Sequence, residues 1–219
     1  MNSIAISPRR VLATRNAGWA KQMARVLRRL GTTPNAVSVA GVLWSIVGCA
    51  AFALAPASGG DARVVAFVVA AAAIQLRLLC NLLDGMLAVE EGLKSPLGDL
   101  YNEIPDRLAD VAILLGAGAA IRDLTGGLAL GCAAAIAALF TAYVRVLGGS
   151  LGVTQSFAGP MAKQHRMFTL TVAALCGAGE AALGLPPHAV RAGLVLVVAG
   201  SIVTACRRIV GVANELEAR

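Results

Sequence analysis

Six stretches of the chain are almost wholly apolar, and each approaches the length of a membrane-spanning helix. They lie at residues 37–57, 64–84, 98–120, 127–147, 167–184 and 189–207. A helix needs about 20 residues to cross the hydrocarbon core at about 1.5 Å per residue. The stretch at 98–120 is polar over its first third, so we expect that third to face other helices or water. The pattern predicts an all-α polytopic membrane protein with six transmembrane helices.

The segment before the first span has a different pattern, because residues 8–30 predict an amphipathic helix. Basic residues occupy most of the positions outside its apolar face. A helix of this kind lies in the membrane interface, with its apolar face in the acyl boundary and its cations near phosphates. A simple topology signal is the alternative, and the two are compatible. The apolar face consists of Leu12, Trp19, Met23, Val26 and Leu30.

Together these patterns predict three parts of the chain. A basic N-terminal segment with the amphipathic helix covers residues 1–34, a six-helix transmembrane domain covers 35–211, and a C-terminal tail covers 212–219.

Composition and charge agree with a membrane protein. The chain has 219 residues, of which 58% are hydrophobic and only 14% charged, against roughly 25% charged residues in a soluble domain. Its net charge of +7 does not indicate nucleic acid, because residues 1–34 hold seven Lys or Arg and no acid. Such a bias sets membrane orientation and attracts anionic lipids. We expect an integral protein of a bacterial inner (plasma) membrane, with both termini in the cytoplasm.

Polar residues interrupt the apolar pattern where the second span ends and the third begins. Asn81 and Asp84 are three residues apart, and Asn102 and Asp106 are four apart, so each pair shares one helix face. Only 13 residues (85–97) connect the spans, which predicts antiparallel neighbours whose polar faces meet. A charge at bilayer depth costs roughly 2.5–3.5 kcal/mol and usually has a task. Oxygen ligands from two helices suit Mg²⁺ or Mn²⁺, which can hold a phosphate.

This region resembles the CDP-alcohol phosphotransferase family. The family carries Asp-x2-Asp-Gly-x2-Ala-Arg-x8-Gly-x3-Asp-x3-Asp over the second and third of six transmembrane helices. Every spacing of that frame is kept here. Further similarities are TPNAVSVAG before the first span and AYVRV at 142–146. The frame in this chain reads Asn81-x2-Asp84-Gly85-x2-Ala88-Val89-x8-Gly98-x3-Asn102-x3-Asp106.

The resemblance implies an enzyme of phospholipid biosynthesis. It would transfer a substituted phosphoryl group from a CDP-linked donor, such as CDP-diacylglycerol, to an alcohol acceptor, and release CMP. Asp106 would be the general base. The resemblance also implies a homodimer among membrane lipids. The implied metal site consists of Asn81, Asp84, Asn102, Glu103 and Asp106, the nucleotide pocket of Gly85, Ala88 and Gly98, and the phosphate- or acceptor-binding set of Arg145, Lys163 and Arg166.

The chain departs from the family frame at three positions. Asn81 and Asn102 stand where the family has aspartates, and Val89 stands where it has arginine. An amide oxygen can coordinate a metal, but with much less attraction than a carboxylate. Asp99 and Glu103, or Glu90 and Glu91 in the loop, are candidates to restore ligands. The candidates to restore the cation are Lys94, Arg145, Lys163 and Arg166.

These departures leave an alternative function open. In that alternative, the protein is a catalytically impaired family member that binds lipid or nucleotide or acts as a scaffold. A transporter or channel would explain the hydrophobicity but not the frame.

Overall fold

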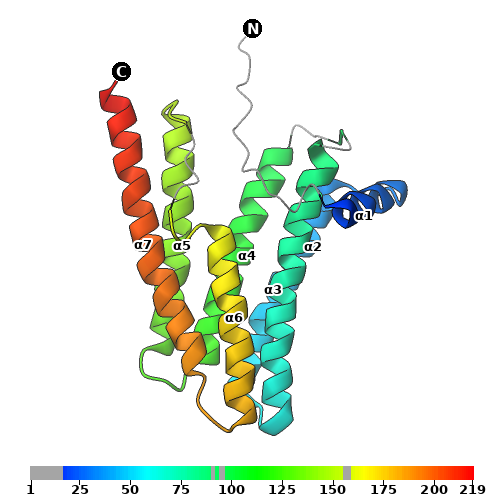
Figure 1. Ribbon diagram of the computed structural model, residues 1–219, viewed down its shortest axis with the longest axis vertical. Coiled ribbons are helices and arrows are strands. Elements are labelled where there is room, and N and C mark those ends of the chain that lie inside the picture. The colour runs from blue at the N-terminus through cyan, green and yellow to red at the C-terminus, as the bar shows by residue number, and fades with distance from the viewer. Residues whose placement is uncertain (1–16, 90–91, 94–96, 155–158) are drawn as a thin grey trace.

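The computed structural model describes residues 17–89, 92–93, 97–154 and 159–219, and this part of the chain is helical apart from its connections. The predicted all-α architecture is therefore confirmed (Figure 1). The helices are α1 (Gly18–Arg29), α2 (Pro34–Leu54) with a short 3₁₀ turn η2 (Ala55–Ala57), α3 (Gly60–Val89), α4 (Gly98–Ala120), α5 (Gly127–Ser150), α6 (Lys163–Ala182) and α7 (His188–Glu217).

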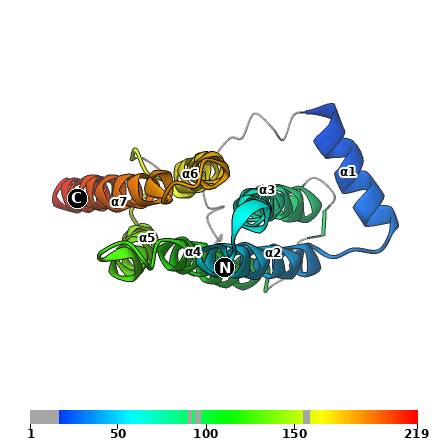
Figure 2. The same cartoon turned by 90° about the horizontal axis from the view of Figure 1, so that it is seen from below.

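The long helices form two layers. One layer holds α2, α4 and α5, and the other holds α3, α6 and α7 (Figure 2). Within the layers α2 contacts α4, α4 contacts α5, α3 contacts α6 and α6 contacts α7, while α2–α3 and α5–α7 contacts join the layers. This arrangement places the start of α4 and the end of α3 near the same end of the bundle as the C-terminus (Figure 1).

Four helices, α2, α3, α5 and α7, are long and apolar enough to cross a membrane, counting only the described residues. Helices α4 and α6 do not meet that criterion, although both have the required length. Two helices also run further than their apolar cores indicated. Helix α3 continues to Val89, so Asp84 lies inside it rather than at its end, and α7 continues beyond residue 211 to Glu217.

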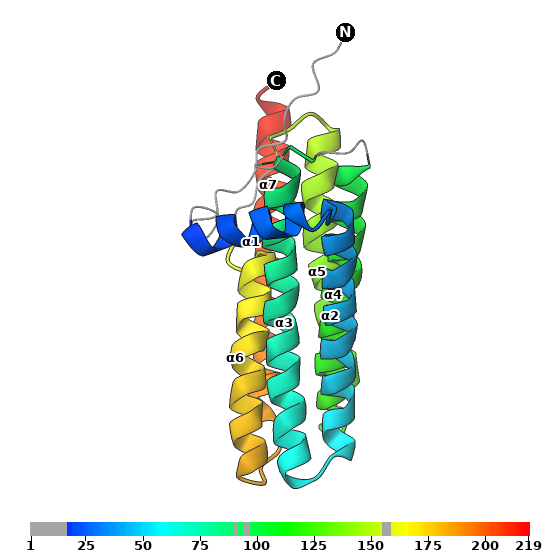
Figure 3. The same ribbon diagram turned by 90° about the vertical axis from the view of Figure 1, so that its right-hand side faces the viewer.

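Helix α1 runs across the bundle axis instead of along it (Figure 3). It packs on α3 through the small residues Ala20 and Ala24, which join a buried cluster with Leu83 and Leu87 of α3. The apolar positions predicted from the sequence point the other way: Trp19 is 51% exposed and Leu30 is 74% exposed. Residues 8–16 of the predicted amphipathic helix lie outside the described residues.

Glycines allow the closest contacts between helices. A Cβ on Gly118 of α4 would lie 2.7 Å from the Cα of Gly131 on α5, and a Cβ on Gly116 would lie 2.6 Å from the Cα of Cys49 on α2. Such distances leave no room for any larger side chain. Backbones that approach so closely gain van der Waals contact. In a membrane this contact drives helix association, because the surrounding lipid is as apolar as the helix surfaces and there is no hydrophobic driving force. Glycines at these positions therefore set how closely α4 packs against α2 and α5.

Candidate functional site

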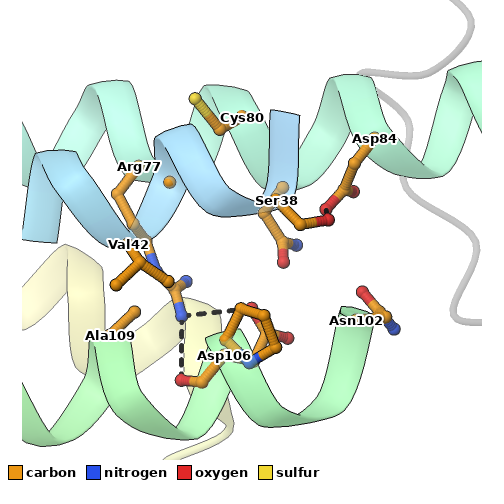
Figure 4. Close-up of a pocket in the computed structure, with 11 residues that line it drawn as sticks. Ser38, Val42, Arg77, Cys80, Asp84, Asn102, Asp106 and Ala109 are labelled. Carbon is orange, nitrogen blue, oxygen red and sulfur yellow. Dashed lines mark hydrogen bonds and ion pairs between the residues drawn. The ribbon is translucent and has the colours of Figure 1, made fainter. Parts of the chain in front are cut away.

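A pocket lies between α2, α3 and α4, and the polar pairs of the sequence frame open into it. Asp84 lies on α3, and Asn102 and Asp106 lie on α4 (Figure 4). Asn81 of α3 lines the same pocket. The four side chains therefore line one pocket, as the sequence pattern predicted. The pocket is lined by Ser38, Gly41, Val42, Arg77, Cys80, Asn81, Asp84, Asn102, Pro105, Asp106 and Ala109.

Asp84 is buried, at 7% exposure, and its carboxylate contacts a side chain of α2. Ser38 of α2 donates a hydrogen bond from its Oγ to Asp84 Oδ2 at 2.7 Å. The start of α2 positions this serine, because Thr33 accepts a hydrogen bond from the Ala36 N–H and Pro34 follows as the first helical residue, a common way to begin a helix. Sequence reasoning did not indicate Ser38. Its position one turn after the Thr33-Pro34 start was the available signal.

Asp106 is surrounded by cations from three directions. Lys163, the first residue of α6, donates from Nζ to Asp106 Oδ2 and also to Asn81 Oδ1, the latter at 2.6 Å. Arg77 of α3 donates from Nη2 to Asp106 Oδ1 at 3.3 Å, and Arg107 lies at 3.8 Å from Oδ2. Lys163 thus joins α3 to α4 at the two frame residues Asn81 and Asp106.

One turn further along α4 from Asp106, the carboxylate of Asp110 connects two buried arginines. Arg77 Nη2 donates to its Oδ1 at 2.7 Å, and Arg166 Nη2 donates to its Oδ2 at 2.9 Å. All three side chains are 2% exposed. Arg166 also donates from Nη1 to Thr141 Oγ1 at 3.2 Å and to the Met161 carbonyl at 2.9 Å. The resemblance implied that Arg166 binds phosphate. In the structure its guanidinium group makes its hydrogen bonds inside the bundle.

The other predicted site residues are not among those that line the pocket. Glu103 accepts from Arg145 Nη2 at 2.6 Å and lies 3.4 Å from Arg107. Arg145 thus reaches the outer edge of the polar cluster from α5. Gly85 and Ala88 follow Asp84 along α3, and Gly98 is the first residue of α4.

Several candidate compensating residues lie outside the described part of the structure. They are Glu90, Glu91, Lys94 and the side chain of Asp99.

The donor set does not fit a pair of divalent cations. Within the described residues no three His, Cys, Asp or Glu side chains form a group that can hold a metal ion. The oxygens that do converge belong to two carboxylates and two amides, and Asp106 and Asn81 already accept from Lys163. Hard divalent cations bind through charged oxygen ligands. Only two carboxylates line this pocket, and one of them, Asp106, is already paired with Lys163 and Arg77.

The described part of the chain is a largely apolar helical bundle with a charged cluster near one end, and its long apolar helices are those of an integral membrane protein. Its fold is that of the CDP-alcohol phosphotransferases, because solved structures of one of them match over most of the chain. That protein is the phosphatidylinositol phosphate synthase of Mycobacterium tuberculosis. No family model matches the chain, and no curated protein sequence matches it.

The match to this synthase is extensive in structure and low in sequence. Its structure with CDP-DAG bound has a TM-score of 0.75 and 21% identity, over 90% of this chain and 94% of that chain. Its complex with manganese and citrate has a TM-score of 0.70 and 22% identity, over 88% of each chain. The apo form gives a TM-score of 0.70 at 21% identity, over 87% of this chain and 94% of that chain. The family resemblance read from the sequence is thereby confirmed for the fold.

Proposed function

We propose that this protein is a membrane enzyme of phospholipid biosynthesis, which transfers a substituted phosphoryl group from a CDP-linked lipid to an alcohol and releases CMP. CDP-diacylglycerol is the proposed donor. The observation that carries the proposal is the convergence of Asn81, Asp84, Asn102 and Asp106 on one pocket. They do so in a fold shared with a synthase whose structure holds CDP-DAG.

In the proposed reaction the acceptor oxygen forms a bond to the phosphorus next to the lipid, and the bond from that phosphorus to the CMP oxygen breaks. CMP leaves with the bonding electron pair, and the acceptor proton passes to Asp106. Arg77 and Lys163 lie beside Asp106 and are suited to hold phosphate charge, since cationic donors make strong hydrogen bonds to phosphate oxygens. Arg145, at the cluster edge, is proposed to bind phosphate or acceptor.

The nucleotide-binding role of Gly85, Ala88 and Gly98 stays a proposal by resemblance. A Mg²⁺ or Mn²⁺ ion held by Asn81, Asp84, Asn102, Glu103 and Asp106 also stays a prediction. The synthase was solved with manganese, but the donor set described above does not favour an ion here.

The membrane arrangement that we propose has six spans. Helix α6 has 20 residues and α4 has 23, so each is about 30 Å long or more. Lys163 and Arg166 of α6 and Asp106 and Asp110 of α4 pair with each other in the cluster described above. Helix α1 would lie in the interface, because apolar residues on it, among them Trp19 and Val26, are exposed rather than packed on the bundle. Both termini would be cytoplasmic. A homodimer stays a prediction.

A second candidate function is supported by the contacts of Asp106. Both of its carboxylate oxygens already accept hydrogen bonds from cations, so an acceptor hydroxyl must compete with these contacts for Asp106. The alternative is a protein that binds a CDP-linked lipid without turning it over.

Release of CMP separates these two candidates. The full-length protein in nanodiscs containing CDP-diacylglycerol is incubated with a panel of alcohol acceptors, and CMP is measured. We expect release with the wild type and none with Asp106→Asn. Asp123→Asn is the matched control, because Asp123 is 77% exposed and lies in the connection between α4 and α5. Equal CMP release by wild type and Asp106→Asn would exclude Asp106 as the base. Binding without release would favour the second candidate.

A further inference from the structure

The ammonium group of Lys163 lies where two helices present converging oxygens. Its Nζ contacts Asn81 Oδ1 at 2.6 Å on α3 and Asp106 Oδ2 on α4. A cation that joins oxygens from two helices is the geometry expected of a bound metal ion, and here a side chain of a third helix supplies it. An ammonium has three N–H donors, so one remains for a ligand after these two contacts. The side chain of Lys163 is 19% exposed, and the two residues that it contacts, Asn81 and Asp106, both line the pocket.

Arg77 offers a second donor in the same pocket. The residue is 1% exposed, lines the pocket, and uses Nη2 for Asp106 and Asp110. Its Nη1 is buried and has no hydrogen-bond partner among the described residues. A buried donor without a partner carries a substantial free-energy cost. A ligand oxygen that accepts from Nη1 removes this cost, and an anionic oxygen does so most strongly.

The charges around the pocket are balanced without any metal. Among the described residues, Asp106 and Asp110 form ion pairs with Arg77, Lys163 and Arg166, and the buried Asp84 accepts a hydrogen bond from Ser38. Glu103 is likewise paired, with Arg145 and Arg107. Two divalent ions would add four positive charges to this cluster, with amides at Asn81 and Asn102 in place of carboxylates. Burying uncompensated charge is costly, so the cluster disfavours such ions.

We infer that Lys163 and Arg77 act in place of divalent metal in this protein, and that they hold the phosphates of a CDP-linked lipid directly. The inference rests on the proposed function for the identity of the ligand. Lys163 provides one N–H and Arg77 provides Nη1, both beside Asp106. The two asparagines fit this role, because an amide oxygen accepts from an ammonium without demanding further positive charge.

The first test measures metal and ligand binding on the full-length wild-type protein in nanodiscs. Mn²⁺ binding is followed by electron paramagnetic resonance, and binding of CDP-diacylglycerol by native mass spectrometry, with excess EDTA and with millimolar Mg²⁺. We expect no stoichiometric Mn²⁺, and equal binding of CDP-diacylglycerol in both conditions. Stoichiometric Mn²⁺ together with ligand binding that EDTA abolishes would overturn the inference and leave the proposed function standing. Absence of ligand binding in both conditions would instead overturn the proposed function and the inference with it.

The second test changes the cation itself. Lys163→Met is expected to weaken CDP-diacylglycerol binding by about tenfold or more, the effect of losing one charge-assisted hydrogen bond. Lys163→Arg should retain part of the affinity, whereas Lys21→Met, a change at an exposed lysine on α1, should leave it unchanged. Unaltered affinity in Lys163→Met would contradict the inference.

A reverse substitution keeps the inference testable even if Lys163→Met folds poorly. The triple variant Asn81→Asp, Asn102→Asp, Lys163→Met restores two carboxylates and removes the resident cation. We expect it to acquire Mn²⁺ binding that the wild type lacks. Equal Mn²⁺ binding by the wild type and the triple variant would show that Lys163 does not stand in place of a metal ion.

Discussion

The two ends of the helical bundle are held together by different forces. At the end that contains the pocket, α3, α4 and α6 meet through Arg77, Asp110 and Arg166, all buried and joined by hydrogen bonds. At the opposite end, α4 and α5 meet backbone to backbone at Gly118 and Gly131, and Phe52 packs edge-on against Phe67. Long paired side chains keep helices apart and leave room for a ligand, whereas glycines close that room. The position of the pocket follows from this difference.

The largest expected effect comes from removing the centre of the charged end. Asp110→Ala would leave Arg77 and Arg166 as buried cations without their shared carboxylate. We expect the free energy of unfolding to fall by about 3–5 kcal/mol, as when one partner of a buried ion pair is lost. Denaturant-induced unfolding in mixed micelles measures it. The matched change Asp123→Ala, at an exposed acid, should stay within about 0.5 kcal/mol. Similar losses in both variants would mean that burial of the pair does not matter.

A smaller effect is expected at the closely packed end. In Gly118→Ala the new methyl group would meet the Gly131 backbone at 2.7 Å, and such overpacking costs about 1–3 kcal/mol. Gly179→Ala on α6 is the control, because nothing lies within 4 Å of its Cβ position. That change should be neutral or stabilise by up to about 1 kcal/mol through a less flexible unfolded chain. The same unfolding measurement compares the two, and equal stability would contradict close helix contact at Gly118.

The smallest effect tests whether burial or charge sets the strength of the site end. Glu103 pairs with Arg145, but its side chain is 37% exposed. Glu103→Gln should therefore lower the free energy of unfolding by no more than about 1 kcal/mol, the range of exposed ion pairs. An effect as large as that of Asp110→Ala would show that the outer pair is part of one cooperative network with the buried one.

The residues that sequence reasoning placed well are those whose partners are near in the chain. Asn81 with Asp84 and Asn102 with Asp106 share helix faces by their spacing alone, and the short connection predicts that the faces meet. The pocket brings all four together. Apolar length likewise located the helices, although the ends of α3 and α7 ran past their apolar cores, because a helix continues into polar residues once packing supports it.

The surroundings that local patterns could not predict depend on contacts across helices. The resemblance implied a phosphate-binding role for Arg166, and the structure places its side chain in the bundle interior, where it donates to Asp110. Ser38 is uncharged and was not singled out from the sequence, yet its hydroxyl donates a hydrogen bond to Asp84.

The sequence by itself determined the helical membrane class, the location of the polar pairs and the family resemblance, because helix periodicity and hydropathy are local properties. Only the tertiary structure decided that Lys163, 57 residues beyond Asp106, reaches both Asp106 and Asn81. It also decided that Arg77 lines the pocket and that its Nη1 is buried without a hydrogen-bond partner among the described residues. Such contacts depend on how α6 is rotated and shifted against α3 and α4, which packing of the whole bundle sets and no local pattern encodes.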